Sequence, residues 1–132
     1  LAMKDKQGLY LVPLNFGYEL DSETLTLYFH SAREGRKISA LSSGAPVCFE
    51  MDCSHHLVEG DIPCGYTYEF QSLIGFGTAV LVDDPEEKKH ALTVLMKHMT
   101  DKEFLFDDKM ADIVEVIKIQ TDNYTGKANR ML

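Results

Sequence analysis

Positive charge is scarce in this sequence. It holds 13 lysine and arginine residues against 21 aspartate and glutamate residues, which gives a net charge of −8 at pH 7. Binding to nucleic acid requires clustered cations, so this deficit argues against a nucleic-acid surface. A small anionic ligand remains compatible with the composition if the few cations gather in one place.

Long apolar runs are also absent, and the three cysteines are not the even number that a disulfide framework uses. No run approaches the ~20 apolar residues that a membrane-spanning helix needs, and no secretory signal is recognisable. Cys48, Cys53 and Cys64 are irregularly spaced, which argues against a disulfide framework and favours reduced thiols in a cytoplasmic protein. The chain begins at Leu1 rather than at a methionine, and we expect further residues upstream.

Nothing in the sequence marks a domain boundary. There is no internal repeat, no low-complexity tract and no linker rich in proline, glycine or serine. Hydrophobic residues make up 45% and charged residues 26% of the chain, as is usual for a globular protein. We therefore expect residues 1–132 to form a single domain.

Several segments have the composition or alternation of β-strands, and a polar stretch, residues 19–23, suits a hairpin. The strand-like segments are residues 9–16, 24–30, 47–52, 66–82 and 113–121. In the second of these, Leu25, Leu27 and Phe29 alternate with Thr26, Tyr28 and His30, so the two sets lie on opposite faces. In the fourth, Gly75 and Gly77 predict a bend or a close approach by another backbone.

Two helices are predicted. Asp84 followed by Pro85 and two glutamates is a strong start signal, and an apolar stripe at helical spacing follows it. His90 and His98 fall on the polar side of this helix, and neither needs a function. A short second helix is expected over residues 33–41. Antiparallel-looking strands with so few helices predict a small barrel or a strongly curved sheet rather than a parallel α/β fold.

Residues 28–37, Tyr-Phe-His-Ser-Ala-Arg-Glu-Gly-Arg-Lys, join the end of a predicted strand to the start of the short helix. Arg33, Arg36 and Lys37 stand at i, i+3 and i+4 and would form one cationic stripe. Together with the Ser31 hydroxyl and backbone N–H groups at the helix start, this stripe can cradle a phosphate. A solvated helix face, partly neutralised by Glu34, accounts for the same spacing and stays open.

Four motifs follow one another along the chain. They are Val-Pro-Leu-Asn-Phe-Gly-Tyr at 12–18, the segment at 28–37, Ser-Leu-Ile-Gly-Phe-Gly-Thr-Ala at 72–79, and Thr-Gly-Lys at 125–127. Together they resemble the split barrels related to pyridoxamine 5′-phosphate oxidase, specifically the nitroimidazole-resistance branch, over residues 10–127. The resemblance implies a mainly β fold, a six-stranded antiparallel split β-barrel of the FMN-binding type, and a homodimer that binds FMN in two clefts built from both subunits.

The resemblance also implies which residues contact the cofactor. It places Ser31, Arg36 and Lys37 on the flavin phosphate. It places Leu14, Asn15, Phe29 and His30 along the ribityl chain and one edge of the isoalloxazine ring. Gln71 and Ser72 match a strand that contacts flavin in relatives, and Thr125, Gly126 and Lys127 would close the cleft from the partner chain. The oxidase itself has a second arginine-rich patch, which binds the phosphate of its substrate. Near the C-terminus of this chain the counterparts are limited to Lys127 and Arg130, so pyridoxine oxidation is not expected.

The function implied by this branch is reduction of a nitroaromatic drug, such as a 5-nitroimidazole, by hydride transfer from reduced flavin. His30 is the candidate for the acid or for a substrate contact, because histidine titrates near neutral pH. A purely structural role for His30, as a hydrogen-bond partner of a backbone carbonyl or of flavin, is an equally supported alternative. The alternative function is a non-catalytic flavin- or haem-binding split barrel, a carrier or sensor, with His30, His55 or His56 as possible haem ligands.

A second group of possible ligands lies in one loop. Cys53, His55, His56 and Cys64 offer the atoms that zinc accepts. Their spacing is not that of a structural zinc site, and adjacent histidines rarely reach one metal. We therefore expect a polar loop between strands and no metal.

Overall fold

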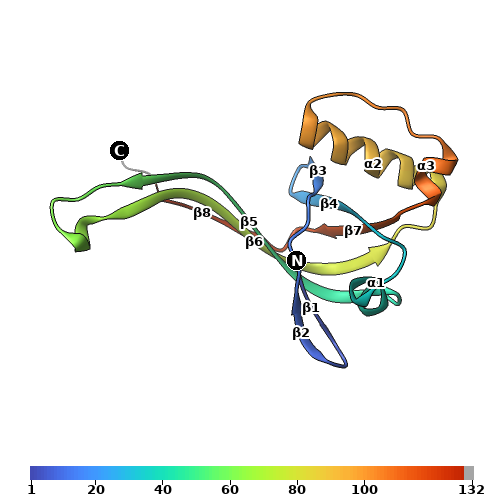
Figure 1. The fold of residues 1–132 in the computed structure, drawn as a ribbon, viewed down its shortest axis with the longest axis horizontal. Coiled ribbons are helices and arrows are strands. Elements are labelled where there is room, and N and C mark those ends of the chain that lie inside the picture. Colours follow the sequence, from blue (N-terminus) through green and yellow to red (C-terminus); the bar gives the residue numbers. More distant parts are fainter. Residues whose placement is uncertain (130–132) are drawn as a thin grey trace.

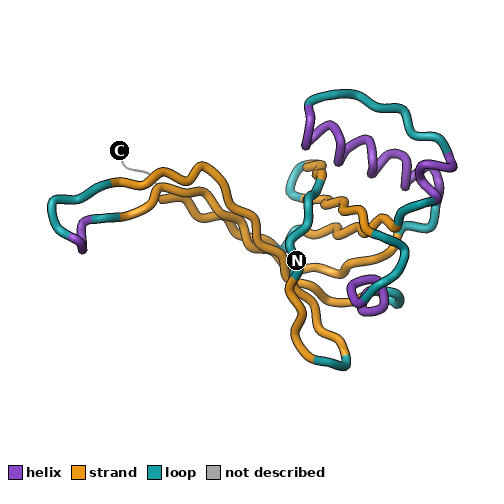
Figure 2. Tube along the Cα trace, in the orientation of Figure 1, coloured by secondary structure: helices purple, strands orange, loops and turns teal. Residues whose placement is uncertain are grey.

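The computed structural model describes residues 1–129 as one strongly curved antiparallel sheet with helices on two sides (Figures 1 and 2). Among these residues the sheet has eight strands: β1 Ala2–Asp5, β2 Gly8–Leu11, β3 Gly17–Asp21, β4 Thr24–Ser31, β5 Ala45–Val58, β6 Thr67–Leu81, β7 Glu115–Thr121 and β8 Tyr124–Asn129. Their order is β2-β1-β5-β6-β7-β4-β3, with β8 paired to β6. Arg130 lies outside the described residues.

The mainly β split-barrel class is confirmed, but the expected number of six strands is wrong. β1, β3 and β8 are short strands whose sequences show no long apolar alternation, and their pairing partners define them. The expected strand at residues 9–16 ends at Leu11, since Pro13 lacks the N–H group that a strand needs. The expected hairpin is present, with Ser22 at φ 56° in its turn between β3 and β4.

The long helix forms as predicted. α2 spans Pro85–Thr100, and the Asp84 carboxylate accepts a hydrogen bond from the Glu87 N–H at 2.8 Å. The short helix α1, Arg36–Leu41, begins later than expected, after Gly35 at φ 126°. A 3-10 turn spans Pro63–Gly65. A further helix that was not expected, α3, spans Asp108–Asp112 and is capped at its N-terminus by Asp107. No helix among residues 1–129 has both the length and the apolar character to cross a membrane.

Hydrophobic cores lie on both faces of the sheet. One packs around Leu27, Phe49 and Ile119 with α1. The other packs beneath α2 and α3 and includes Tyr28 and Val116. β4 is therefore buried on both sides, with Leu27 in one core and Tyr28 in the other. The alternation of its sequence predicts the two faces, but not the burial of the face that carries Thr26 and Tyr28.

The halves of β5 and β6 distant from the cores project from the body as an arm, and β8 pairs with β6 along it (Figures 1 and 2). A bulge between Cys53 and His56 interrupts the pairing of β5, with Ser54 at φ 60°. Gly75 lies where the arm meets the body, and a side chain there would clash with the Phe49 ring. The group that approaches Gly75 closely is thus the Phe49 ring and not another backbone segment.

Candidate functional site

Two neighbouring pockets share the walls Phe16, Leu27, Met51 and Asp52. The first, here called the hairpin pocket, has a volume of about 520 Å³. Its other walls include Leu11, Val12, Leu14, Phe29, Phe49 and Glu50. The second, here called the arm pocket, has a volume of about 570 Å³. Its other walls include Tyr18, Leu20, Gln71, Ser72, Leu73 and His98. Both volumes are in the range of small-molecule sites.

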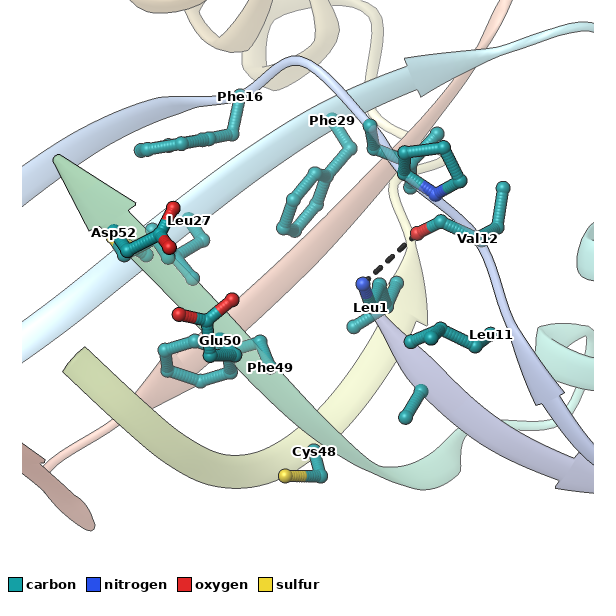
Figure 3. A pocket seen from close by; sticks show the side chains of 14 residues that line it. Leu1, Leu11, Val12, Phe16, Leu27, Phe29, Cys48, Phe49, Glu50 and Asp52 are labelled. Atoms are coloured by element: carbon teal, nitrogen blue, oxygen red, sulfur yellow. Dashed lines mark hydrogen bonds between the residues drawn. The ribbon is translucent and has the colours of Figure 1, made fainter. Parts of the chain in front are cut away.

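The hairpin pocket has an apolar wall and an acidic wall. Figure 3 shows the rings of Phe16 and Phe29 on one side and the carboxylates of Glu50 and Asp52 on the other. β4 supplies Phe29, the segment after β2 supplies Leu14, and β5 supplies the acids. This pocket suits a planar, uncharged ring better than a phosphate, because its charged side chains are carboxylates.

The cations near α1 do not form the expected stripe. Arg33 lies before the helix, where its Nη1 donates to the Asp112 carbonyl at 3.0 Å and its Nε lies 3.6 Å from a Glu115 carboxylate oxygen. The Arg36 guanidinium pairs with Asp5 and lies over the Tyr10 ring. Half-buried Lys37 has no hydrogen bond or ion pair with any other of residues 1–129. Lys37 is therefore the cation of the three that is open to an anion.

His30 and its neighbours take different directions at the end of β4. His30 pairs across the strands with Val116, on the face of the sheet that also carries Tyr28, and it is exposed. Phe29 points to the opposite face and lines the hairpin pocket. Ser31 is half-buried at the end of β4, and Asn15 is exposed before β3. The His30 side chain thus lines neither pocket.

The predicted contacts on the arm are brought together by strand pairing. Ser72 of β6 pairs with Lys127 of β8, and Gln71 pairs with the next residue along β8. Gln71, Ser72 and Gly126 line the arm pocket, and the Lys127 ammonium lies 5.8 Å from the centre of the Phe70 ring. Thr125 is exposed on the same strand. In Figure 1 the arm points away from α1, so one chain does not join these residues to Lys37.

The sequence predicts no function for His98, yet His98 lines the arm pocket. It lies near the end of α2, with its ring 5.0 Å from the Phe16 ring and 5.1 Å from the Tyr18 ring. No local pattern places it there. The contact depends on α2 packing against β3 at Gly17, where an added Cβ would lie 2.5 Å from the Leu95 backbone.

Cys53, His55 and His56 lie in β5 and Cys64 lies in the 3-10 turn, so only part of the expected polar loop between strands is a loop. The imidazole of His55 bonds to the Asp52 carboxylate at 3.1 Å, and His56 and Cys64 are exposed. Over residues 1–129 no three histidine, cysteine or acidic side chains gather in a way that could hold a metal. Each of the three cysteines carries a free thiol.

Comparison with known proteins gives a consistent result. The family model described as pyridoxamine 5′-phosphate oxidase matches residues 1–128. The chain is similar to a solved structure named for 5-nitroimidazole antibiotic resistance, from Bacteroides thetaiotaomicron VPI-5482. The two share 38% identity with a TM-score of 0.79, over 95% of this chain and 72% of that chain. None of the curated proteins matches the chain.

Two more distant structures share the fold. One is the FAD and heme binding protein from Mycobacterium smegmatis, at 18% identity and a TM-score of 0.80, over 98% of this chain and 64% of that chain. The other is a flavocytochrome from Azotobacter vinelandii, at 18% identity and a TM-score of 0.77, over 98% of this chain and 60% of that chain. The chain thus spans less than two thirds of the length of either protein.

Proposed function

The chain belongs to the pyridoxamine 5′-phosphate oxidase family, and on this premise we propose that it binds FMN and reduces nitroaromatic compounds such as 5-nitroimidazoles. One observation carries the proposal: 38% identity, over 95% of this chain, to a protein named for 5-nitroimidazole resistance. The family supports flavin chemistry, and this relative supports the choice of substrate.

The residues near α1 and the hairpin pocket fit the two ends of FMN. Lys37 is uncompensated by any acid among the described residues, and an uncompensated cation favours binding of a phosphate. The Ser31 hydroxyl, at the end of β4 and shortly before α1 in the sequence, is proposed as a further donor to that phosphate. The hairpin pocket offers the Phe29 ring and the Leu14 side chain to an aromatic ring system. Bound flavin would supply the two-electron chemistry, while the protein orients it and keeps water from its apolar face.

Each chain supplies only part of this site, and we propose that a second copy completes it. Most even-numbered residues of β6 are apolar and lie along one largely exposed face of the strand, here called the β6 ladder, although Ser72 and Thr78 on that face are polar. Its large members, with their exposed fractions, are Tyr68 (55%), Ile74 (44%), Phe76 (51%) and Val80 (37%). An apolar surface of this extent favours an interface with another protein. In a homodimer formed there, the partner's arm would bring Gln71, Ser72 and residues 125–127 to the flavin.

His30 keeps a limited part in this proposal. Its side chain lies on the face of β4 opposite Phe29, so a direct role in proton transfer requires a substrate or a partner chain to reach that face. Its backbone, next to Phe29 and Ser31, is available to the cofactor without that condition. We therefore propose His30 as a backbone contact to flavin first and as an acid second.

The test uses purified protein reconstituted with FMN. We expect a yellow protein whose flavin absorption is bleached by dithionite and returns on anaerobic addition of 1,2-dimethyl-5-nitroimidazole. Flavin that rebinds but is not reoxidised by the nitro compound would leave the carrier function in place of the enzyme. A Soret band after incubation with haem would favour the haem-binding alternative. A protein that takes up neither cofactor would refute both functions.

A further inference from the structure

His98 is the one histidine of the arm pocket, and its position there is built by aromatic contacts. The ring lies 5.0 Å from Phe16 at an interplanar angle of 35° and 5.1 Å from Tyr18 at 82°. Phe16 and Tyr18 flank Gly17, whose closeness to the Leu95 backbone locks α2 against β3. Two rings and a helix crossing thus orient an imidazole at the pocket wall.

His98 is exposed, and its polar atoms are open to solvent or to a ligand. Neither of its ring nitrogens forms a hydrogen bond with another of residues 1–129, although His55 and His90 both pair with carboxylates. A neutral imidazole carries one N–H donor and a protonated one carries two. An imidazole held in place at a pocket wall, with a free donor, favours an acceptor group on the bound molecule.

The rest of the arm pocket defines the ligand further. Leu20, Leu25 and Leu27 line it, as do Met51 and Leu73, and the one charged side chain on its wall apart from the imidazole is Asp52, which is paired with His55. A carboxylate disfavours an anionic ligand, and apolar walls disfavour any net charge. Phe16 and Tyr18, which line the pocket and contact His98, have electron-rich ring faces, and such faces favour an electron-poor ring as a partner.

The arm pocket also adjoins the proposed cofactor site. It shares Phe16 and Leu27 with the hairpin pocket, where the flavin ring of the same chain is proposed to bind, whereas its Gln71 and Ser72 are proposed to contact the flavin of the partner chain. A molecule bound in the arm pocket therefore lies against a wall of the proposed flavin pocket of its own chain. That neighbourhood is what a substrate of flavin chemistry requires.

We propose that the arm pocket binds a neutral, electron-poor aromatic ring that carries a hydrogen-bond acceptor, such as a nitro group, and that the His98 ring donates a hydrogen bond to that acceptor. The inference rests on the proposed function, since it names the subsite and the recognising residue for the nitroaromatic substrate. It assigns His98 a contact with the substrate and leaves flavin binding to other residues.

The experiment is a binding titration of the protein as purified, followed through the ring signals of its histidines by NMR. Nitrobenzene is the probe, and toluene, which has a methyl group in place of the nitro group, is the matched control ligand. We expect the His98 signals to shift on saturation with nitrobenzene and the His90 signals to stay in place. The His98→Gln variant assigns the signals.

Affinity then separates the hydrogen bond from mere packing. His98→Phe keeps an aromatic ring and removes the donor, so we expect nitrobenzene to bind about tenfold more weakly and toluene to bind as before. His90→Phe, on the same helix and away from the pocket, is the control variant and leaves both affinities unchanged. FMN titrations of all three proteins run in parallel and should agree.

Two results would overturn the inference. One is that the His98 signals do not move at a high concentration of nitrobenzene, which is also the result expected if a second copy of the chain fills the pocket. The other is a loss of affinity in His98→Phe that is equal for both ligands. Failure to bind FMN, with nitrobenzene binding intact, would instead refute the proposed function and leave the pocket assignment standing. The titration of the unsubstituted protein decides the matter even if a variant does not fold.

Discussion

Asp5 holds Arg36 by two hydrogen bonds, from Nε to Oδ2 at 2.6 Å and from Nη2 to Oδ1 at 3.0 Å. The guanidinium carbon also lies 4.4 Å from the centre of the Tyr10 ring. The hydrogen bond from Arg36 lowers the pKa of the Asp5 carboxyl and raises the pKa of the guanidinium. The pair fastens the β1–β2 hairpin, a wall of the hairpin pocket, to α1.

Breaking this pair should loosen the hairpin. We expect Asp5→Ala to speed hydrogen exchange at the amides of β1, β2 and α1, because Arg36 loses the carboxylate that ties it to the hairpin. Since the pKa of Asp5 is lowered in the fold, its pairing with Arg36 stabilises the folded state at neutral pH. This contribution to the free energy of unfolding is lost as the pH falls below about 4. Lys6→Ala, in the hairpin turn, is the control, and its amides should exchange at the rates of the parent protein. Equal exchange rates in the two variants would contradict the role of the Asp5–Arg36 pair in holding the hairpin to α1.

Lys37 should contribute more to the flavin phosphate than Arg36, whose donors are partly occupied by Asp5. We expect Lys37→Ala to weaken FMN binding by between about ten- and a hundredfold, as the loss of one charged hydrogen bond predicts. Arg36→Ala should cost less, and the double variant should cost more than either. Fluorescence titration of FMN measures the change. Lys4→Ala on β1 serves as the control, and an affinity unchanged in Lys37→Ala would remove the phosphate site from α1.

The β6 ladder should govern the oligomeric state. Phe76→Glu places a charge where the side chain is already 51% exposed, so the single chain should fold while the proposed homodimer dissociates. Light scattering during gel filtration measures the mass. Leu105→Glu, at a 98% exposed leucine away from the arm, should remain dimeric. A dimer that survives Phe76→Glu would place the interface elsewhere.

Gly17 should tolerate no side chain. A Cβ there would lie 2.5 Å from the backbone of Leu95, which cannot move without shifting α2, so Gly17→Ala should destabilise the fold by about 3 kcal/mol or more. Gly126→Ala is the matched change, since its Cβ would meet only the Ser72 carbonyl at 3.8 Å. Urea unfolding compares the two. Equal stability of the two variants would show that α2 does not pack on β3 in this way.

Tyr28 should give the fold a sensitivity to alkali. Burial first, and then Glu19 and Glu87, raise the pKa of its phenol from 10.0 to about 12. The unfolded chain therefore ionises first, so the stabilising contribution is complete below pH 10 and is lost as the pH rises towards 12. By pH 11 the parent should lose about 1 kcal/mol more than Tyr28→Phe, measured by urea unfolding at pH 9 and 11. Parallel losses in the two proteins would contradict the shift.

Local patterns determined several elements from the sequence alone. The N-cap at Asp84 and the alternation along β4 depend on contacts within a few residues, and both are present in the structure as predicted. The family resemblance added the split-barrel class and the candidate flavin residues. These features were accessible because helix capping and strand alternation are written in neighbouring positions.

Tertiary structure decided the rest. β3 and β8 exist because longer strands pair with them, and β1 exists because it pairs with β2 and, at Ala2, with β5. A short polar segment carries no record of its partner. The availability of Lys37 and the occupation of Arg36 depend on Asp5, which lies 31 residues from Arg36 in the chain. His98 reaches the arm pocket only because α2 crosses β3 at Gly17. Such contacts join residues that are distant in sequence, so packing determines them and local pattern does not.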